Sequence, residues 1–383
     1  MISFDLTDEQ RSMQDLAHNF AEKEIRPVAA EYDEREEMPW DVIKKAAQTG
    51  MLSFYIPEQY GGAGITDLMT HCLVMEEIAW GCAGVATVMG GNDLVVTPFL
   101  LAGNDEQKEK YLPRFCDTEN PSLGAFAITE PDAGSDPGSL TTQAVKDGNH
   151  YIVNGRKAFI TNGGVADLIV LFATLDPGKG YKGITAFILE KDFPGLKIGK
   201  KEKKMGIKSS QTVELIFEDM RVPVENRLGE EGEGFKIAMQ TFEYTRTNVA
   251  IFAVGVARAA YEFALAYAQE RIQFGKPIIR HQGIGFMLAD MATEIDAARI
   301  LCWRAACLTD KGKPAMKEAS MAKLFAGDVA MEVTTNAVQV LGGYGYTREY
   351  PVEKWMRDAK IMQIYEGTSQ IQRMIIARQL VGR

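Results

Sequence analysis

Cysteine and histidine are scarce in this chain of 383 residues, and neither shows the spacing of a metal site. The five cysteines are an odd number and contain no CxxC pair, which predicts free, buried thiols in a reducing compartment and no disulfide framework. The four histidines (His18, His71, His150 and His281) are scattered, so each is interpreted as a hydrogen-bonded structural residue. We expect no metal ion.

Basic charge and long apolar runs are also lacking. The formal net charge is −10, which argues against nucleic-acid binding. The N-terminal residues MISFDLTDEQ are acidic and contain no apolar segment, so no secretory signal is expected. No uninterrupted run of about eighteen apolar residues occurs, so we predict no membrane-spanning segment. These features favour a cytoplasmic protein.

Two common nucleotide-binding signatures are missing. No GxGxxG follows a predicted strand, and no GxxxxGK[ST] occurs, so a nucleotide cofactor would not be bound through a Rossmann turn or a P-loop. The composition is otherwise that of a globular protein, with 46% hydrophobic and 25% charged residues. The length allows two or three domains.

Hydrophobic periodicity divides the chain into three blocks: a helical domain over 1–120, a β-domain over 121–230 and a helical bundle over 231–383. The first block predicts a helix opened by a capping box at Thr7. Further helices are predicted there over 39–51, 66–80 and 84–101 and from Asp105 to Tyr111. The fold class is therefore α+β, mostly α.

The middle and last blocks have distinct textures. Short β-branched and aromatic runs predict strands over 150–162, 167–175, 184–191, 196–200 and 212–222. The step Asn154-Gly155 predicts a hairpin turn. Bundle helices are predicted over 233–273, 279–310, 315–341, 350–364 and 369–380, with Val249–Ala268 as a central, fully buried segment.

The segment RDAKIMQIYEGTSQIQR (357–373) contains a carboxylate at a helix break. The helix stops at Gly367 and restarts through Thr368-Ser369, and Ser369 with Gln372 predicts a capping box. Glu366 stands between the two helices among apolar neighbours. Burial would raise its pKa toward neutrality, which makes it a candidate general base. The alternative is an exposed loop glutamate.

Four motifs that lie far apart in the sequence must be considered together. They are AITEPDAGSD (127–136), AFITNGG (158–164), ERIQFGKPI (270–278), and QVLGGYGY (339–346) with IYEGTSQIQ (364–372). Together, in this order, they resemble the acyl-CoA dehydrogenase family over essentially the whole chain, most closely its short- and medium-chain members. The resemblance implies that family's fold: an N-terminal helical domain, an antiparallel β-domain and a four-helix-type bundle.

The resemblance also implies FAD as the cofactor. The flavin-binding residues that it implies are Phe126, Ile128, Thr129, Ser135, Phe159, Thr161, Arg271, Phe274, Gln282, Gln339, Gly342, Gly343, Thr368 and Gln370. Phe159 and Thr161 would face the ring system, and Phe159 stands where medium-chain relatives often carry Trp. The segments around Arg271 and Gln339 would reach the flavin of a neighbouring subunit, so a homotetramer is implied. The glycine pair 342–343 also suits a helix C-cap.

For the substrate, the resemblance implies contacts of acyl-CoA with Ser135, Glu243, Thr245, Arg246, Tyr365 and Gly367. Glu366 would remove the α-proton, and its backbone N–H with a flavin hydroxyl would polarise the thioester carbonyl. Thr245 occupies a position where other branches of the family carry the base. Since threonine cannot act as one, Glu366 is favoured.

The segment 84–101 departs from the family pattern. Gly90-Gly91 costs a helix about 1–2 kcal/mol relative to alanine, which suggests a close approach by another group. Asp93 adds a second carboxylate near the implied acyl pocket. An alternative function is therefore dehydrogenation of an alicyclic (cyclohexane- or cyclohexene-carboxyl) acyl-CoA with Asp93 as a second acid or base. The competing interpretation places Asp93 at solvent or at a subunit interface.

The sequence thus predicts an FAD-dependent acyl-CoA dehydrogenase of fatty acid β-oxidation that forms a 2,3-enoyl-CoA from a short- or medium-chain acyl-CoA. By resemblance, electrons would pass to an electron-transferring flavoprotein. Two less favoured alternatives are an acyl-CoA oxidase and a non-catalytic flavin or acyl-CoA binding protein.

Overall fold

The computed structural model describes residues 5–382. The N-terminal part is helical: α1 (Asp8–Phe20), a π-helical turn (Ala21–Ile25), α2 (Arg26–Arg35), α3 (Trp40–Gln48), α4 (Leu68–Gly81), α5 (Ala83–Ala102) and α6 (Asp105–Tyr111). The predicted helices of this block are confirmed to within a few residues. The capping box at Thr7 is also confirmed, because the Thr7 hydroxyl accepts from Gln10 N and the Gln10 side chain accepts from Thr7 N.

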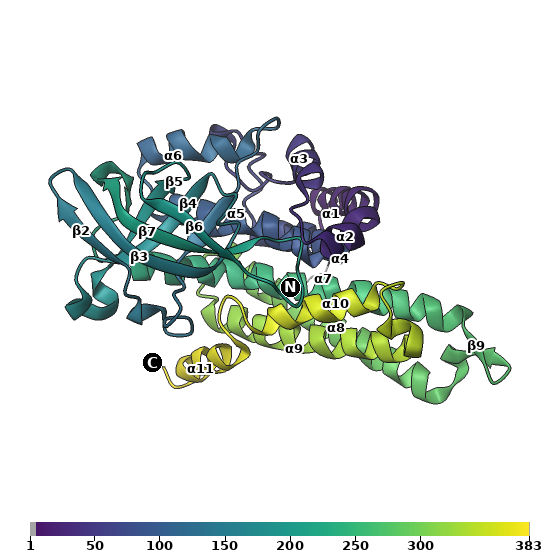
Figure 1. Ribbon diagram of the computed structural model, residues 1–383. Coiled ribbons are helices and arrows are strands. Elements are labelled where there is room, and N and C mark those ends of the chain that lie inside the picture. The colour runs from purple at the N-terminus through teal and green to yellow at the C-terminus, as the bar shows by residue number, and fades with distance from the viewer. Residues whose placement is uncertain (1–4, 383) are drawn as a thin grey trace.

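A β-sheet follows and is placed against one end of the helices (Figure 1). Its strands are β1 (Gly124–Ala127), β2 (Gln143–Asp147), β3 (His150–Thr161), β4 (Leu168–Thr174), β5 (Ile184–Glu190), β6 (Leu196–Lys201), β7 (Thr212–Pro223) and β8 (Arg227–Leu228). The order is β6-β7-β3-β2-β4-β5-β8. Most neighbours are antiparallel, but β1 pairs with β4 in parallel and β2 meets β4 in a single parallel pair, so the sheet is mixed.

The hairpin predicted at Asn154-Gly155 is wrong. Strand β3 continues through both residues, and the chain reverses earlier, between β2 and β3, where Gly148 has φ of 61°. Gly155 instead lies at a register shift against β7. A Cβ there would lie 2.7 Å from Thr142 Oγ1, so the glycine permits a close strand approach and not a turn.

The C-terminal part is a bundle of long helices: α7 (Gly234–Glu270), α8 (Gln282–Asp310), α9 (Met316–Leu341), α10 (Val352–Ala359) and α11 (Ser369–Leu380), with a small hairpin of β9 (Ile272–Gln273) and β10 (Lys276–Pro277). Helices α7, α8 and α9 run side by side, and β9 lies at the end of the bundle opposite the sheet (Figure 1). The helix predicted over 350–364 is shorter: α10 ends at Ala359 and a 3₁₀ turn, Lys360–Gln363, continues it.

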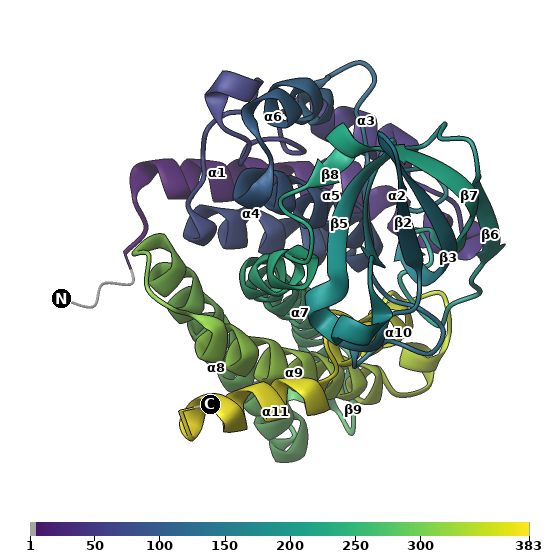
Figure 2. The same cartoon turned by 90° about the vertical axis from the view of Figure 1, so that its left-hand side faces the viewer.

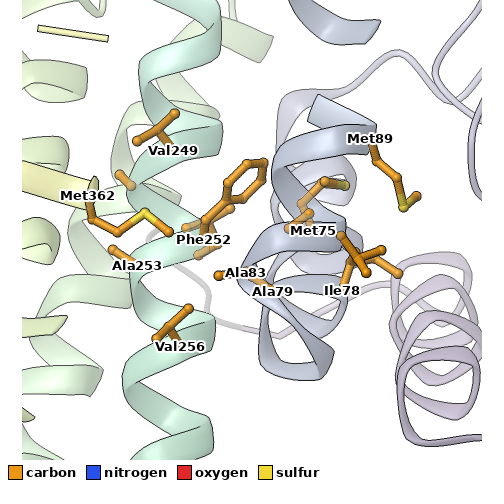
Figure 3. Close-up of a cluster of buried hydrophobic side chains, with 14 of the residues drawn as sticks. Met75, Ile78, Ala79, Ala83, Met89, Val249, Phe252, Ala253, Val256 and Met362 are labelled. Atoms are coloured by element: carbon orange, nitrogen blue, oxygen red, sulfur yellow. The ribbon is translucent and has the colours of Figure 1, made fainter. Parts of the chain in front are cut away.

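Helix α7 is the centre of the molecule (Figure 2). It contacts α4, α5, α8 and α9, and a Cβ at Gly255 would lie 2.4 Å from Glu76 O on α4. Figure 3 shows Met75 and Ala79 of α4 beside Phe252 of α7 across this core. The prediction of a fully buried 249–268 segment holds only for its first half, since exposed residues appear from Glu262 onward.

By length and composition alone, α5 and α7 are apolar enough to cross a membrane, although neither contains an uninterrupted run of about eighteen apolar residues. Within the protein, 72% and 67% of these apolar windows are buried, as in the core helices of a globular protein. The cysteines are all free, but they are not uniformly buried: Cys116 is partly exposed and Cys307 is exposed.

Candidate active site

A cavity of about 1090 Å³ lies where the sheet meets the bundle. Its wall is formed by α5, by the loop after β1, by the end of β3, by α7 and by the segment from Arg357 to Arg378. Glu366 is part of this wall, as expected of a base and not of an exposed loop carboxylate. The cavity therefore brings together chain segments that are far apart in sequence.

Burial raises the pKa of the Glu366 carboxyl from 4.5 to about 7. The Thr245 hydroxyl, which donates to Glu366 Oε2 at 2.8 Å, opposes this rise, as do the charges of Arg246 and Lys323. The charge of Asp93 adds to it. Close to neutral pH the group therefore exists in both protonation states, which suits a residue that accepts and releases a proton.

The backbone around Glu366 is held in an uncommon conformation. Glu366 and Gly367 have φ of 50° and 94°. Gln372 Nε2 donates to the carbonyl oxygens of both residues at 3.2 and 3.0 Å, and Lys323 Nζ donates to Gly367 O at 2.6 Å. Since a Cβ at Gly367 would lie 2.6 Å from Gln372 Nε2, only glycine fits there.

The capping box predicted for Ser369 and Gln372 is wrong. The N-cap of α11 is Thr368, whose hydroxyl accepts from Ile371 N at 3.2 Å. Gln372 is fully buried and points its amide at the two carbonyls before the helix. The helix restart therefore serves to fix the Glu366 loop.

One wall of the cavity carries the residues predicted to meet the flavin: Phe126, Ile128, Thr129, Ser135, Phe159, Thr161 and Thr368. Phe159 has φ of 58° at a register shift between β3 and β7, and its side chain is 63% exposed. The regular strand alternation assumed for Phe159 and Thr161 is therefore interrupted. The hydroxyls of Thr129, Ser135 and Thr161 form no hydrogen bond with any residue in the described range 5–382, so they are available to a ligand.

The loop that carries Thr129 is tied down by a buried ion pair. Lys157 Nζ lies 2.7 Å from Glu130 Oε1 and donates to Ile128 O at 3.0 Å, and both charged side chains are buried. Glu130 also accepts from Thr141 N at 2.7 Å. The neighbouring Lys157 charge and these donors overcome the effect of burial and lower the pKa of Glu130 to about 2.

On the substrate side, Thr245, Arg246, Tyr365 and Gly367 line the cavity as predicted. Arg246 is 5% exposed and its Nε has no hydrogen-bond partner within the described residues. Glu243 does not line the cavity; its carboxylate accepts from Ala315 N at 3.2 Å. Its predicted contact with CoA therefore stays a prediction without support from this cavity.

Several predicted flavin contacts lie elsewhere. They are Arg271, Phe274, Gln282, Gln339, Gly342, Gly343 and Gln370, all exposed and absent from the cavity wall. The two segments expected to act together do meet, since the Arg271 guanidinium lies 5.6 Å from the Tyr344 ring. Gly342, with φ of 61°, is the C-cap of α9, which confirms the C-cap interpretation. The role of these segments at a neighbouring subunit stays a prediction.

Asp93 lines the cavity and is 2% exposed, so its placement at solvent is wrong. Its Oδ2 is shared by His71 Nε2 and Asn248 Nδ2, each at 3.1 Å. Burial, and after it the neighbouring Asp93 carboxylate, raises the pKa of the Tyr55 hydroxyl. Asp93, His71, Asn248 and Tyr55 therefore form a buried polar cluster, of which Asp93 and Asn248 line the cavity.

The glycine pair next to Asp93 accommodates protein groups. A Cβ at Gly90 would lie 2.9 Å from the Phe252 ring, and a Cβ at Gly91 would lie 2.4 Å from Asn162 Nδ2. The predicted close approach is confirmed. It comes from side chains of α7 and of the turn after β3, so the glycines alone do not indicate a roomier acyl pocket.

Comparison with known proteins gives a consistent result. Family signatures described as the N-terminal, middle and C-terminal domains of acyl-CoA dehydrogenase match residues 7–119, 125–220 and 232–381. An acyl-CoA dehydrogenase of Bacillus subtilis is 49% identical over 98% of this chain and 99% of its own length. A short-chain specific acyl-CoA dehydrogenase of Clostridium acetobutylicum is 47% identical over 99% of this chain and 100% of its own. The chain belongs to the acyl-CoA dehydrogenase family.

Solved structures agree with this family assignment. The structure of butyryl-CoA dehydrogenase from Megasphaera elsdenii matches with a TM-score of 0.96 and 48% identity, covering 99% of this chain and 100% of the other. A chain from the study of the electron transferring flavoprotein of Acidaminococcus fermentans matches with a TM-score of 0.97 and 48% identity, covering both chains completely. The three-part acyl-CoA dehydrogenase fold predicted from the motifs is thus confirmed.

Lys323 of this acyl-CoA dehydrogenase site escaped the sequence interpretation. It is an ionisable residue inside an otherwise apolar helical run, and it is 1% exposed. An ionisable residue on the apolar face of a helix is the signal that could have found it. His71 was interpreted as a hydrogen-bonded structural residue, and its hydrogen bond with Asp93 confirms this. Over residues 5–382, no group of His, Cys, Asp and Glu side chains has the arrangement of a metal site.

Proposed function

We propose that this chain is an FAD-dependent acyl-CoA dehydrogenase that converts a short-chain acyl-CoA into its 2,3-enoyl-CoA. One observation carries the proposal: the Glu366 carboxylate, with its pKa raised to about 7, stands on the wall of a cavity of about 1090 Å³ that also exposes unpaired hydroxyls. Substrates of this chain length are favoured because the relatives named above include a short-chain specific enzyme and a butyryl-CoA dehydrogenase.

The residues present fit FAD. The free hydroxyls of Thr129, Ser135 and Thr161 can donate to a flavin ring or accept from it without adding charge, and the exposed Phe159 ring offers a stacking surface. The volume is that of a large ligand pocket. When bound, FAD supplies the acceptor for the hydride that leaves the β-carbon.

The chain's own residues supply proton transfer and positioning. Glu366 Oε takes the α-proton of the thioester, and the electron pair left behind forms the new double bond as the β-hydride departs. The Thr245 hydroxyl orients the carboxylate through its 2.8 Å hydrogen bond. The Glu366 N–H has no acceptor within residues 5–382, so it can donate to the thioester carbonyl oxygen. Entry of the acyl chain excludes water and strengthens these contacts.

The test is Glu366→Gln, which keeps the shape of the side chain and removes the base. Turnover of butyryl-CoA should fall by about 10²–10⁴ or more, while flavin absorbance and CoA binding remain. Glu332→Gln, on the exposed face of α9, is the matched control and should keep full activity. Retained turnover in Glu366→Gln would refute the assignment of the base.

The partners follow from the same proposal. We propose an electron-transferring flavoprotein as the electron acceptor and a homotetramer as the assembly. Exposed apolar side chains around the β9–β10 hairpin (Ile272, Phe274, Phe286 and Tyr346) support an interface between copies. A cytoplasmic location is supported by the free cysteines. Peroxide formation by the reduced enzyme would instead indicate an acyl-CoA oxidase.

A second candidate function is the dehydrogenation of an alicyclic acyl-CoA. The observation that favours it is the buried Asp93 carboxylate, which lines the cavity and is held by His71 and Asn248. A straight alkyl chain offers this carboxylate no polar group and excludes water from it, which is unfavourable for a charge. Asp93→Asn should therefore lower turnover of ring acyl-CoAs and not of butyryl-CoA. An equal effect on both substrates, or none on either, would remove this candidate.

A further inference from the structure

Lys323, on α9, is a buried cation without a contacting carboxylate. Its side chain is 1% exposed, and within residues 5–382 it forms no salt bridge. Its ammonium group donates a hydrogen bond to Gly367 O, at 2.6 Å. Burial lowers the pKa of this ammonium group to about 8. An ionisable group retained at such an energetic cost next to a reaction site usually acts on that site.

The first action of Lys323 is on backbone geometry. Residues with positive φ other than glycine cost about 1 kcal/mol or more, and Glu366 is such a residue, with φ of 50°. The Glu366–Gly367 peptide is kept there by Lys323 from α9 and by Gln372 from α11, which both donate to Gly367 O. Asp328, one turn further along α9, accepts from Gln363 Nε2 at 2.7 Å and so fastens the chain on the other side of the loop.

The second action is electrostatic. The polar groups that face Glu366 are Thr245 and Arg246 from α7, Lys323 from α9, Asp93 from α5 and Tyr365 from its own segment. Of these, Arg246 and Lys323 favour the ionised carboxylate, and Asp93 disfavours it. Asp328 is engaged by Arg373, Gln363 and Ser369, and among the charges that act on Lys323 the effect of Glu366 is larger than that of Asp328.

We propose that Lys323 is a positioning residue that fixes the Glu366–Gly367 peptide and, by its charge, keeps the base ionised near neutral pH, whereas Gln372 contributes geometry alone. The proposal rests on the proposed role of Glu366 as the base. It assigns a function to α9, a helix that contributes no side chain to the cavity wall among the described residues.

The test compares Lys323→Met, Lys323→Arg and Gln372→Met in the FAD-loaded enzyme. The first readout is kcat/KM for butyryl-CoA against pH, whose acidic limb reports ionisation of the base. The second readout needs no turnover: the C=O band of the protonated carboxyl is titrated in infrared difference spectra against Glu366→Gln. Flavin absorbance and the melting temperature show that each variant is folded.

In Lys323→Met both midpoints should move up by about one pH unit, because a neighbouring cation no longer favours the carboxylate. In Lys323→Arg, whose guanidinium keeps its charge, the midpoints should not rise. Gln372→Met should lower kcat severalfold and leave the midpoints in place. A merely structural lysine would change rate or stability without moving either midpoint.

The outcomes separate this proposal from the one on which it rests. If Glu366→Gln is inactive but folded Lys323→Met keeps the wild-type midpoints, the proposal for Lys323 is wrong and the base assignment stands. If Lys323→Met does not fold, Lys323→Arg decides the question, since a rise of its midpoints would overturn the electrostatic role. If Glu366→Gln retains turnover, both proposals fall.

Discussion

The hydrogen bond from Thr245 to Glu366 gives the most direct test of what determines the pKa of the proposed base, and with it the pH dependence of activity. Thr245 is 2% exposed, and its hydroxyl lies 2.8 Å from Glu366 Oε2 and 3.2 Å from Thr241 O. Valine has nearly the same shape as threonine and no hydroxyl. Thr245→Val therefore removes one donor from the carboxylate and leaves the packing of α7 almost unchanged.

The size of the effect can be worked from the geometry. A hydrogen bond to a charged group contributes about 1.5–3 kcal/mol, which corresponds to about 1–2 pKa units. The effect on the pKa of Glu366 is smaller than this, because the Thr245 hydroxyl also stabilises the protonated form of Glu366. It can accept a hydrogen bond from the protonated carboxyl while donating to Thr241 O. We expect a rise of about one unit above the value of about 7. At pH 7 this means a rate about fivefold lower, with recovery at higher pH.

The assay is kcat/KM for butyryl-CoA between roughly pH 5 and pH 9, where the acidic limb reports ionisation of the free enzyme's base. Thr241→Val is the matched control, because Thr241 is equally buried on the same helix and its hydroxyl donates to Ile237 O at 2.8 Å, away from Glu366. The control should keep the wild-type midpoint. An unchanged or lower midpoint in Thr245→Val would show that this hydrogen bond does not favour the ionised base.

Two further predictions concern stability. Lys157→Met leaves the Glu130 carboxylate buried without its cation, so the free energy of unfolding should fall by about 3–5 kcal/mol in urea titrations. The pKa of Glu130 is about 2 in the folded protein and 4.5 as its reference value, so its contribution to the stability of the fold is complete above pH 4.5 and is lost as the pH falls toward 2. The melting temperature of Glu130→Gln should therefore vary less between these two pH values than that of wild type. Gly91→Ala should destabilise the fold by about 1–3 kcal/mol, because the new methyl group clashes with Asn162. The control is Gly283→Ala in α8, which has open space around it and should be neutral or stabilising by up to about 1 kcal/mol. Equal melting temperatures for the two variants would contradict this prediction.

Most of the fold could be predicted because its elements are long and strongly periodic. The helices α4, α5, α7, α8 and α9 begin and end within a few residues of the predicted positions, since apolar spacing and caps are local properties. The hairpin at Asn154-Gly155 was wrong for the opposite reason. A glycine with positive φ fits a turn or a strand bulge equally well, and the choice depends on Thr142, a residue directly before β2.

The site was predicted unevenly, for a physical reason. Glu366 could be found because its motif is contiguous and its helix break is visible in sequence. Its partners could not, because the Thr245 hydrogen bond spans 121 residues and the contact of Lys323 with Gly367 spans 44. Asp93 was found as an anomaly in its helix, but only the fold shows that it is buried with His71 and Asn248.

The properties of the base therefore depend on residues outside the motif that contains it. Burial raises the pKa of Glu366, Asp93 on α5 adds to the rise, and Thr245 and Arg246 on α7 and Lys323 on α9 oppose it. A chain with the same motif at 364–372 and other residues on these helices would hold a base with a different working pH. Both Lys323→Met and Thr245→Val should raise its midpoint. Because both side chains act on the same Glu366 carboxylate, the shift of the double variant should differ from the sum of the single shifts by an amount equivalent to about 0.5 kcal/mol or more. A strictly additive double variant would show that the two side chains act on Glu366 independently.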